Sequence, residues 1–157
     1  MAERPDELND ALKGPISTHF AALEMLALAF DYRDKSTSGH SRRVANLTVR
    51  VARRHGVAGE LLLQIEHGAL LHDIGKLKMP DCILWKPDSL DDLEWATMRK
   101  HPQYGYEFLR DLDSFDDAAE LVLSHHEKFD GSGYPRGLRG EDIPLGARIF
   151  AVVDAVD

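Results

Sequence analysis

The sequence contains a single cysteine, Cys82, so no internal disulfide can form and a reducing compartment is expected. It also lacks a long apolar run, because the longest one, over residues 21–30, contains Glu24 and is too short to cross a bilayer. Its first residues lack the basic segment followed by an apolar segment that marks a secretory signal. These absences predict a cytoplasmic protein with no membrane partner.

Positive charge is also scarce in this chain. It carries 19 lysines and arginines against 27 acidic residues, and its formal net charge is -8. It has no basic stripe to displace counterions from a phosphate backbone, which argues against non-specific binding to nucleic acid polymers. An anionic substrate would therefore need a local source of positive charge, and bound metal ions are such a source.

Alternating apolar and polar residues, the pattern of a β-strand, do not occur convincingly in the 157 residues, and there are no internal repeats. Helical spacing is present instead, since apolar residues recur on one helical face over residues 16–30 and 44–51. A third helix is predicted over residues 60–71. We predict an all-α protein, with a polar tail or linker remnant at residues 1–14 and one domain over residues 15–157.

Local signals predict where several helices begin and end. Residues 89–92 (Ser-Leu-Asp-Asp) resemble a capping box, and residues 114–117 (Ser-Phe-Asp-Asp) resemble another cap. Pro102 is expected to separate two helices, because the residue before a proline is disfavoured in a helix. Gly75 suits the left-handed residue that ends a helix. The glycine-rich segment 131–146 cannot form a core and predicts a functional loop.

Histidines gather at the predicted helix ends and breaks. Five histidines occupy these positions: His40, His72, His101, His125 and His126. Imidazole and carboxylate groups are ligands of first-row divalent metals, and with Asp73 and Asp154 these histidines make seven potential ligands. Seven ligands are too many for one tetrahedral zinc and suit two octahedral ions. Two ions roughly 3.5–4 Å apart clamp a phosphoryl group and supply hydroxide near neutral pH, so the pattern predicts metal-assisted hydrolysis of a phosphate ester.

The same residues carry a resemblance to a known family. The pair His72-Asp73 with the later Asp154 resembles the HD phosphohydrolase superfamily. The stretch over residues 125–135, which ends in Gly-Tyr-Pro, resembles the signature of its HD-GYP branch. Further matching segments are Gly39-His40-Ser41, His101-Pro102 and Ile143-Pro144-Leu145, so the similarity covers residues 34–157.

This resemblance implies an HD-domain helical bundle with a glycine-rich GYP loop. It also implies a phosphodiesterase that hydrolyses cyclic di-GMP to linear pGpG, and onward to GMP, with a hydroxide activated by two ions of iron or manganese. One ion would be held by His40, His72, Asp73 and Asp154, and the other by Asp73, His101, His125 and His126, with Asp73 bridging. Lys76 resembles the lysine that contacts the scissile phosphate and assists the leaving oxygen. Tyr134 is a candidate for contact with guanine.

Two features depart from the family pattern. Members with a third metal ion use a glutamate at the position of Ser36, and serine is a poor ligand, so two ions are predicted. The family pattern also continues beyond Asp157 into a segment whose arginine helps to hold substrate phosphate. The domain therefore resembles one that is truncated at its C-terminal end.

Alternatives stay open at this point. An HD phosphohydrolase for another nucleotide, a metal-containing cyclic dinucleotide receptor without turnover, and a module whose GYP loop binds a diguanylate cyclase all fit the residues. Histidine and carboxylate ligands do not decide the metal's identity. The oligomeric state is open too, although the apolar helix predicted over residues 16–30 can pair in a homodimer.

Overall fold

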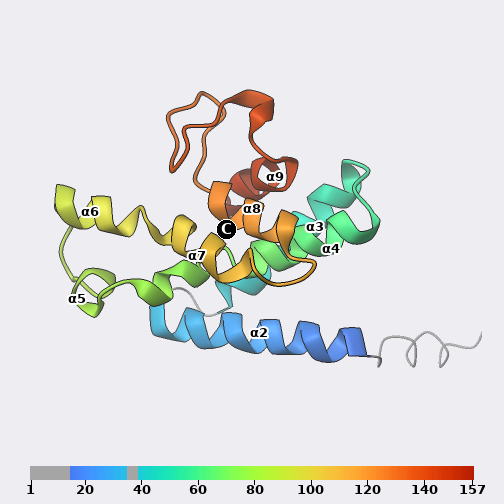
Figure 1. Cartoon of the computed structure of the whole chain (residues 1–157), viewed down its shortest axis with the longest axis horizontal. Helices are drawn as coiled ribbons and strands as arrows, with labels where there is room; N and C mark the ends of the chain where they lie inside the picture. The colour runs from blue at the N-terminus through green and yellow to red at the C-terminus, as the bar shows by residue number, and fades with distance from the viewer. Residues whose placement is uncertain (1–14, 35–38) are drawn as a thin grey trace, which may run out of the picture.

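The computed structural model describes residues 15–34 and 39–157, with side chains from residue 21 onward in the first segment. The tail predicted at residues 1–14 and the position of Ser36 lie outside the described residues. All regular secondary structure in the described part of the chain is helical, as predicted (Figure 1). The elements are α2 (Pro15–Asp34), α3 (His40–Arg54), α4 (Gly59–Leu70), η1 (Ile74–Lys78), α5 (Asp81–Leu84), α6 (Asp92–Met98), α7 (His101–Leu109), α8 (Asp116–Ser124), η2 (Gly140–Asp142) and α9 (Leu145–Asp154).

The core lies among α3, α4, α8 and α9, where α4 and α9 each pack against both α3 and α8. Each of these helices contributes a fully buried apolar side chain, namely Val44, Ile65, Leu121 and Phe150. The long helix α2 lies along one edge of the bundle (Figure 1). Among the described helices, none combines the length and the apolar character that crossing a bilayer requires.

The start of α6 shows a capping box two residues later than predicted. The Asp91 carboxylate accepts hydrogen bonds from the backbone N–H groups of Leu93 and Glu94, each at 2.9 Å, and the Asp91 N–H donates to Glu94 Oε2 at 2.8 Å. The prediction that Ser89 caps this helix is therefore wrong. In a capping box the side chain three residues after the N-cap accepts from the N-cap N–H. Glu94 is long enough to do this for Asp91, whereas Asp92, the corresponding residue for Ser89, has a shorter side chain.

The start of α8 also differs from the prediction. Its N-cap residue is Phe115, which has no side-chain cap, and Ser114 adopts a positive φ of 63°. The acceptor comes instead from α4, where the buried Gln64 Oε1 accepts from the N–H groups of Asp117 at 2.8 Å and Ala118 at 3.2 Å. An acceptor supplied by another helix leaves no local signal in the sequence.

Gly75 has a different role from the predicted one. It does not have a positive φ, and it lies inside the short η1 helix. A Cβ atom on Gly75 would lie 1.9 Å from the backbone oxygen of His101 and 2.5 Å from the amide nitrogen of Gly105. Glycine is therefore needed because η1 packs directly against the first turns of α7. Two helices are separated here as predicted, since α6 ends at Met98 and α7 begins at His101, but the break precedes His101 and Pro102 lies in the first turn of α7.

Replacement of Gly75 by alanine is expected to lower the free energy of unfolding by about 3 kcal/mol, because the added methyl group overlaps backbone atoms that cannot rotate away. Gly140→Ala is the control, because a Cβ there meets nothing within 4 Å and only the positive φ of 60° disfavours it. That control should lose about 1 kcal/mol. Urea denaturation of both variants tests the difference, and equal losses would contradict the packing argument.

Candidate metal centre

The seven predicted ligands lie where helices begin or end. His40 opens α3 and His101 opens α7, whereas Asp154 is the last residue of α9. Two pairs follow directly after a helix: His72 and Asp73 come after α4, and His125 and His126 come after α8. Six of the seven form two groups of three whose ligand atoms lie within 4.8 Å of one another.

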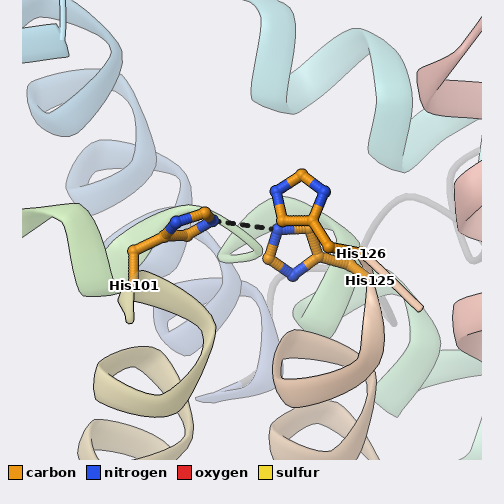
Figure 2. A group of neighbouring side chains, drawn as sticks. All are labelled: His101, His125 and His126. Atoms are coloured by element: carbon orange, nitrogen blue, oxygen red, sulfur yellow. Dashed lines mark hydrogen bonds between the residues drawn. The ribbon is translucent and has the colours of Figure 1, made fainter. Parts of the chain in front are cut away.

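The first group consists of His101, His125 and His126, and we call it the histidine group. Figure 2 shows His101 reaching from α7 toward His125, with His126 beside it at the end of α8. The Nε2 atoms of His101 and His125 are 3.2 Å apart. Two ligand nitrogens about 2.1 Å from a shared ion, at the angles of octahedral or tetrahedral coordination, lie roughly 3.0–3.4 Å apart. The observed separation fits that arrangement.

Backbone carbonyls fix the tautomers of this group. The Nδ1–H of His101 donates to the Met98 oxygen at 2.8 Å, and the Nδ1–H of His125 donates to the Val122 oxygen at 2.7 Å. Since a carbonyl oxygen only accepts, each Nδ1 carries the proton and each neutral ring presents a bare Nε2 lone pair. Two lone pairs that face each other at this distance repel, and a cation between them stabilises the arrangement.

Burial keeps two of these rings neutral. Burial, together with the nearby His126 and His101, lowers the pKa of His125 well below its usual value. Burial and the neighbouring His101 also lower the pKa of His126 to about 4. Neutral imidazole is the form that binds a metal ion. His125 and His126 are therefore in the metal-binding form at neutral pH.

The second group consists of His40, His72 and Asp154, and we call it the mixed group. His40 Nε2 lies 3.5 Å from Asp154 Oδ1, and the rings of His40 and His72 meet edge to face with centroids 5.5 Å apart. The Nδ1–H of His72 donates to the Ala69 oxygen at 2.9 Å, which again leaves Nε2 for a ligand. The hydrogen bond with Asp154 raises the pKa of His40 to about 9, although burial opposes this shift.

Asp73 lies between the two groups. Its Oδ1 is 3.3 Å from His101 Nε2 in the histidine group, and its Oδ2 is 3.3 Å from His72 Nε2 in the mixed group. Burial favours the neutral acid, but His72 and Lys76 outweigh this effect and hold the pKa of Asp73 well below its ordinary value. One ionised oxygen thus faces each group, which is the placement that a bridging ligand requires.

Lys76 reaches the same space from η1. Its Nζ lies 2.7 Å from Asp73 Oδ2 and 3.0 Å from Asp34 Oδ2 at the end of α2. Burial opposes the charge on Lys76, but the two carboxylates outweigh it and raise the pKa of this lysine. Lys76 therefore stays protonated beside the centre. Asp34 was not predicted as its partner, because the two residues are 42 positions apart in the sequence.

An aromatic residue and a cation border the histidine group. The ring of Tyr134 stacks on His126 with centroids 4.8 Å apart and an interplanar angle of 29°. The guanidinium carbon of Arg99, which follows α6, lies 5.5 Å from the centre of the Tyr134 ring. Arg99 was not predicted from the sequence, because a single arginine at a helix end is commonplace there. The predicted Tyr134 does lie beside the ligands.

The profile of the HD domain family matches residues 24–157. The chain belongs to the HD domain family. It is 44% identical to 3'3'-cGAMP-specific phosphodiesterase 2 of Vibrio cholerae, over 84% of this chain and 26% of that protein. It is also 44% identical to the cyclic di-GMP phosphodiesterase response regulator RpfG of Xanthomonas campestris, over 86% of this chain and 36% of that protein.

A third relative is a cyclic di-GMP phosphodiesterase of Thermotoga maritima, 41% identical over 88% of this chain and 38% of that protein. A crystal structure of a cyclic GMP-AMP specific phosphodiesterase of V. cholerae shares the fold, with a TM-score of 0.68, 18% identity and coverage of 85% of this chain and 38% of that one. These relatives confirm the resemblance seen in the sequence. The chain spans only 26% to 38% of the length of the three sequence relatives.

The glycine-rich loop of this HD domain is held by Glu127. Its buried carboxylate accepts hydrogen bonds from the N–H groups of Arg136 at 2.7 Å and Leu138 at 3.0 Å. A Cβ atom on Gly133 would lie 2.3 Å from the Lys128 amide nitrogen, so glycine lets the loop turn back closely over its own start. These contacts set the position of Tyr134 beside His126.

Metal binding by the two groups is expected to respond differently to pH. With a pKa of about 9, His40 carries a proton at neutral pH that must leave before a metal binds, so the mixed group should lose affinity as the pH falls. With a pKa of about 4, His126 offers no such competition in that range. Titration of the metal-free protein with Mn²⁺ at about pH 6 and about pH 8.5 should show one strongly and one weakly pH-dependent site.

His40→Ala is the control for this assignment, because it removes a ligand from the mixed group alone. The variant should retain the weakly pH-dependent site and bind a metal ion at the other site much more weakly. An unaltered protein whose two sites change equally with pH would contradict the expected difference.

Proposed function

We propose that this domain is a metal-dependent phosphodiesterase that hydrolyses cyclic di-GMP to linear pGpG, and onward to GMP. The observation that supports this most directly is the position of Asp73. One of its carboxylate oxygens lies 3.3 Å from His101 Nε2 in the histidine group, and the other lies 3.3 Å from His72 Nε2 in the mixed group. A pair of ions held in this way suits an in-line displacement at phosphorus. The relatives named as cyclic dinucleotide phosphodiesterases make this substrate class the expected one.

The proposed ligands divide as the resemblance implies. His40, His72, Asp73 and Asp154 would hold one ion, and Asp73, His101, His125 and His126 would hold the other. Mixed imidazole and carboxylate donors suit iron or manganese, with availability deciding between them. When bound, the ions would polarise the phosphoryl oxygens and provide a nucleophilic water near neutral pH.

The chain's own residues have the remaining roles in this proposal. Lys76, which stays protonated between Asp73 and Asp34, would stabilise negative charge on the departing ribose oxygen. One face of the Tyr134 ring stacks on His126, so Tyr134 would contact a guanine base through its hydroxyl group or its ring edge. Arg99 adds a planar cation at this border, which can pair with phosphate or stack on a base.

Two of the predicted partners remain predictions. The GYP loop exposes Phe129, 68% accessible, beside a hollow of about 510 Å³ lined by Lys128, Asp130, Arg139 and Gly140, and this surface is where a diguanylate cyclase would dock. On α2, the exposed Met25, Leu26 and Tyr32 form the face that a homodimer would cover.

A second candidate substrate is 3'3'-cGAMP, because two of the similar proteins are named as specific for that compound or for cyclic GMP-AMP. The alternatives of a receptor without turnover and of a phosphohydrolase for another nucleotide also concern the same site. Assays with both cyclic dinucleotides separate these possibilities.

The deciding experiment measures metal content and hydrolysis on one anaerobically prepared sample. About two transition-metal ions per chain are expected, together with pGpG or GMP from cyclic di-GMP. Asp73→Asn should lose the bridging charge and with it both turnover and ion retention, because one substitution affects both groups. Asp142→Asn, an exposed carboxylate in η2, is the control and should behave as the unaltered protein.

Each other outcome points to one alternative. Two bound ions with no product from either dinucleotide would contradict turnover and favour the receptor. Product from 3'3'-cGAMP alone would contradict the substrate that we propose. Full activity of Asp73→Asn would contradict the assignment of the site.

Lys76→Gln is expected to lower kcat about 10²–10³-fold, because a preorganised positive group is lost at the leaving oxygen. Metal content should be unchanged, since Lys76 is not among the ligands. Lys78→Gln is a matched control two residues away, where the lysine pairs with Glu107 at 3.0 Å on the surface. Steady-state kinetics of both variants, with metal analysis, tests the role. A Lys76→Gln enzyme that loses its ions as well would show a structural role instead.

A further inference from the structure

His40 differs from three other predicted ligands in how its ring is oriented. The Nδ1–H groups of His72, His101 and His125 each donate to the carbonyl oxygen three residues earlier, which belongs to the end of a preceding helix. His40 is the first residue of α3, and the contact that the structure gives its Nδ1 is with a carboxylate. Its Nδ1 needs an acceptor from elsewhere if Nε2 is to bind a metal ion.

Asp157 provides that acceptor. Its Oδ2 lies 3.0 Å from His40 Nδ1, and its side chain is only 8% exposed. The carboxylate is itself held by Arg43, whose Nε donates to Oδ1 at 3.0 Å and whose Nη2 donates to Oδ2 at 2.8 Å. This two-point contact fixes the plane of the carboxylate as well as its position.

His40 and Arg43 on one chain segment contact Asp154 and Asp157 on another. His40 and Arg43 are three residues apart on α3 and so share one helical face. Asp154 and Asp157 are three residues apart at the end of α9. His40 contacts Asp154 through Nε2 and Asp157 through Nδ1, so one carboxylate lies on the ligand side of the ring and the other lies behind it.

We propose that Asp157, held by Arg43, is a positioning residue that fixes the ring and tautomer of His40 so that Nε2 faces the mixed group. A carboxylate behind a metal-binding histidine orients the ring and makes its other nitrogen a stronger ligand. The inference rests on the metal centre proposed above. It adds a residue outside the seven ligands, and it assigns a role to one arginine of α3.

Metal binding by the metal-free full chain tests this role without an activity assay. Equilibrium dialysis against Mn²⁺ over a range of concentrations, followed by elemental analysis, gives the affinity of each site. Asp157→Ala should weaken one site about 10–100-fold and leave the other unchanged. Asp157→Asn keeps an oxygen that accepts from Nδ1–H and should retain most of the affinity.

Arg43 and its neighbour Arg42 on α3 provide a test variant and a matched control. Arg43→Ala releases Asp157 and should weaken the same site several-fold. Arg42→Ala should have no effect, because Arg42 pairs with Glu24 at 3.0 Å on a different side of the helix. Circular dichroism establishes that each variant is folded. If Asp157→Ala does not fold, the comparison of Arg43→Ala with Arg42→Ala still decides the question.

A double-mutant cycle with His40→Ala separates positioning from general stability. If Asp157 acts through His40, its removal should cost no further metal affinity once His40 is absent. Asp157→Ala that binds both ions as tightly as the unaltered protein, or that weakens the site equally with and without His40, would overturn the inference. An unaltered protein that binds fewer than two ions would instead contradict the proposed function.

Discussion

The Asp73 carboxylate places one oxygen 3.3 Å from His101 Nε2 and the other 3.3 Å from His72 Nε2, and it pairs with Lys76 at 2.7 Å. A carboxylate with so little access to water persists in ionised form only when donors and positive charges compensate for lost hydration. Lys76 of η1 supplies one such charge, and His72 after α4 and His101 at the start of α7 each place Nε2 3.3 Å from a carboxylate oxygen, where a shared cation would supply more. The fold must therefore hold these segments within reach of one side chain, and the absence of a side chain at Gly75 permits that approach.

Helix ends suit this task for a physical reason. The last carbonyl oxygens of a helix have no amide partner within the helix, so they are free to accept from a side chain that follows. His72 and His125 come directly after a helix and use such oxygens, which sets their tautomers and directs Nε2 away from the backbone. The ligands thus gather at termini because the helix itself orients them. His101 begins α7 but follows α6 so closely that it uses the Met98 oxygen in the same way, whereas His40 contacts a carboxylate from beyond α9 instead.

The all-helical architecture was predictable because helical periodicity is a property of short segments. The candidate ligands were predictable because the histidines fall at predicted helix ends and the whole set lies in motifs that resemble the HD-GYP family. What failed depended on contacts between distant segments. Gln64 caps α8 from another helix, which local capping rules cannot detect. Gly75 matched a helix-ending pattern, yet its real constraint is the backbone of His101 on a different element. Arg99 and Asp157 carry no motif of their own, and only their neighbours Tyr134 and His40 reveal them.

The charges around the site bear on how an acidic protein can bind an anionic substrate. Four carboxylates, Asp34, Asp73, Asp154 and Asp157, surround the two groups, and Lys76 and Arg43 are each already paired with members of this set. A phosphodiester that approaches these groups without bound ions would find Lys76 and Arg43 already neutralised by carboxylates. Bound divalent ions reverse the local sign and outweigh the protein's own charges there. Under the proposed function, substrate binding therefore follows ion binding, because the ions supply the positive charge that the site's own paired cations do not.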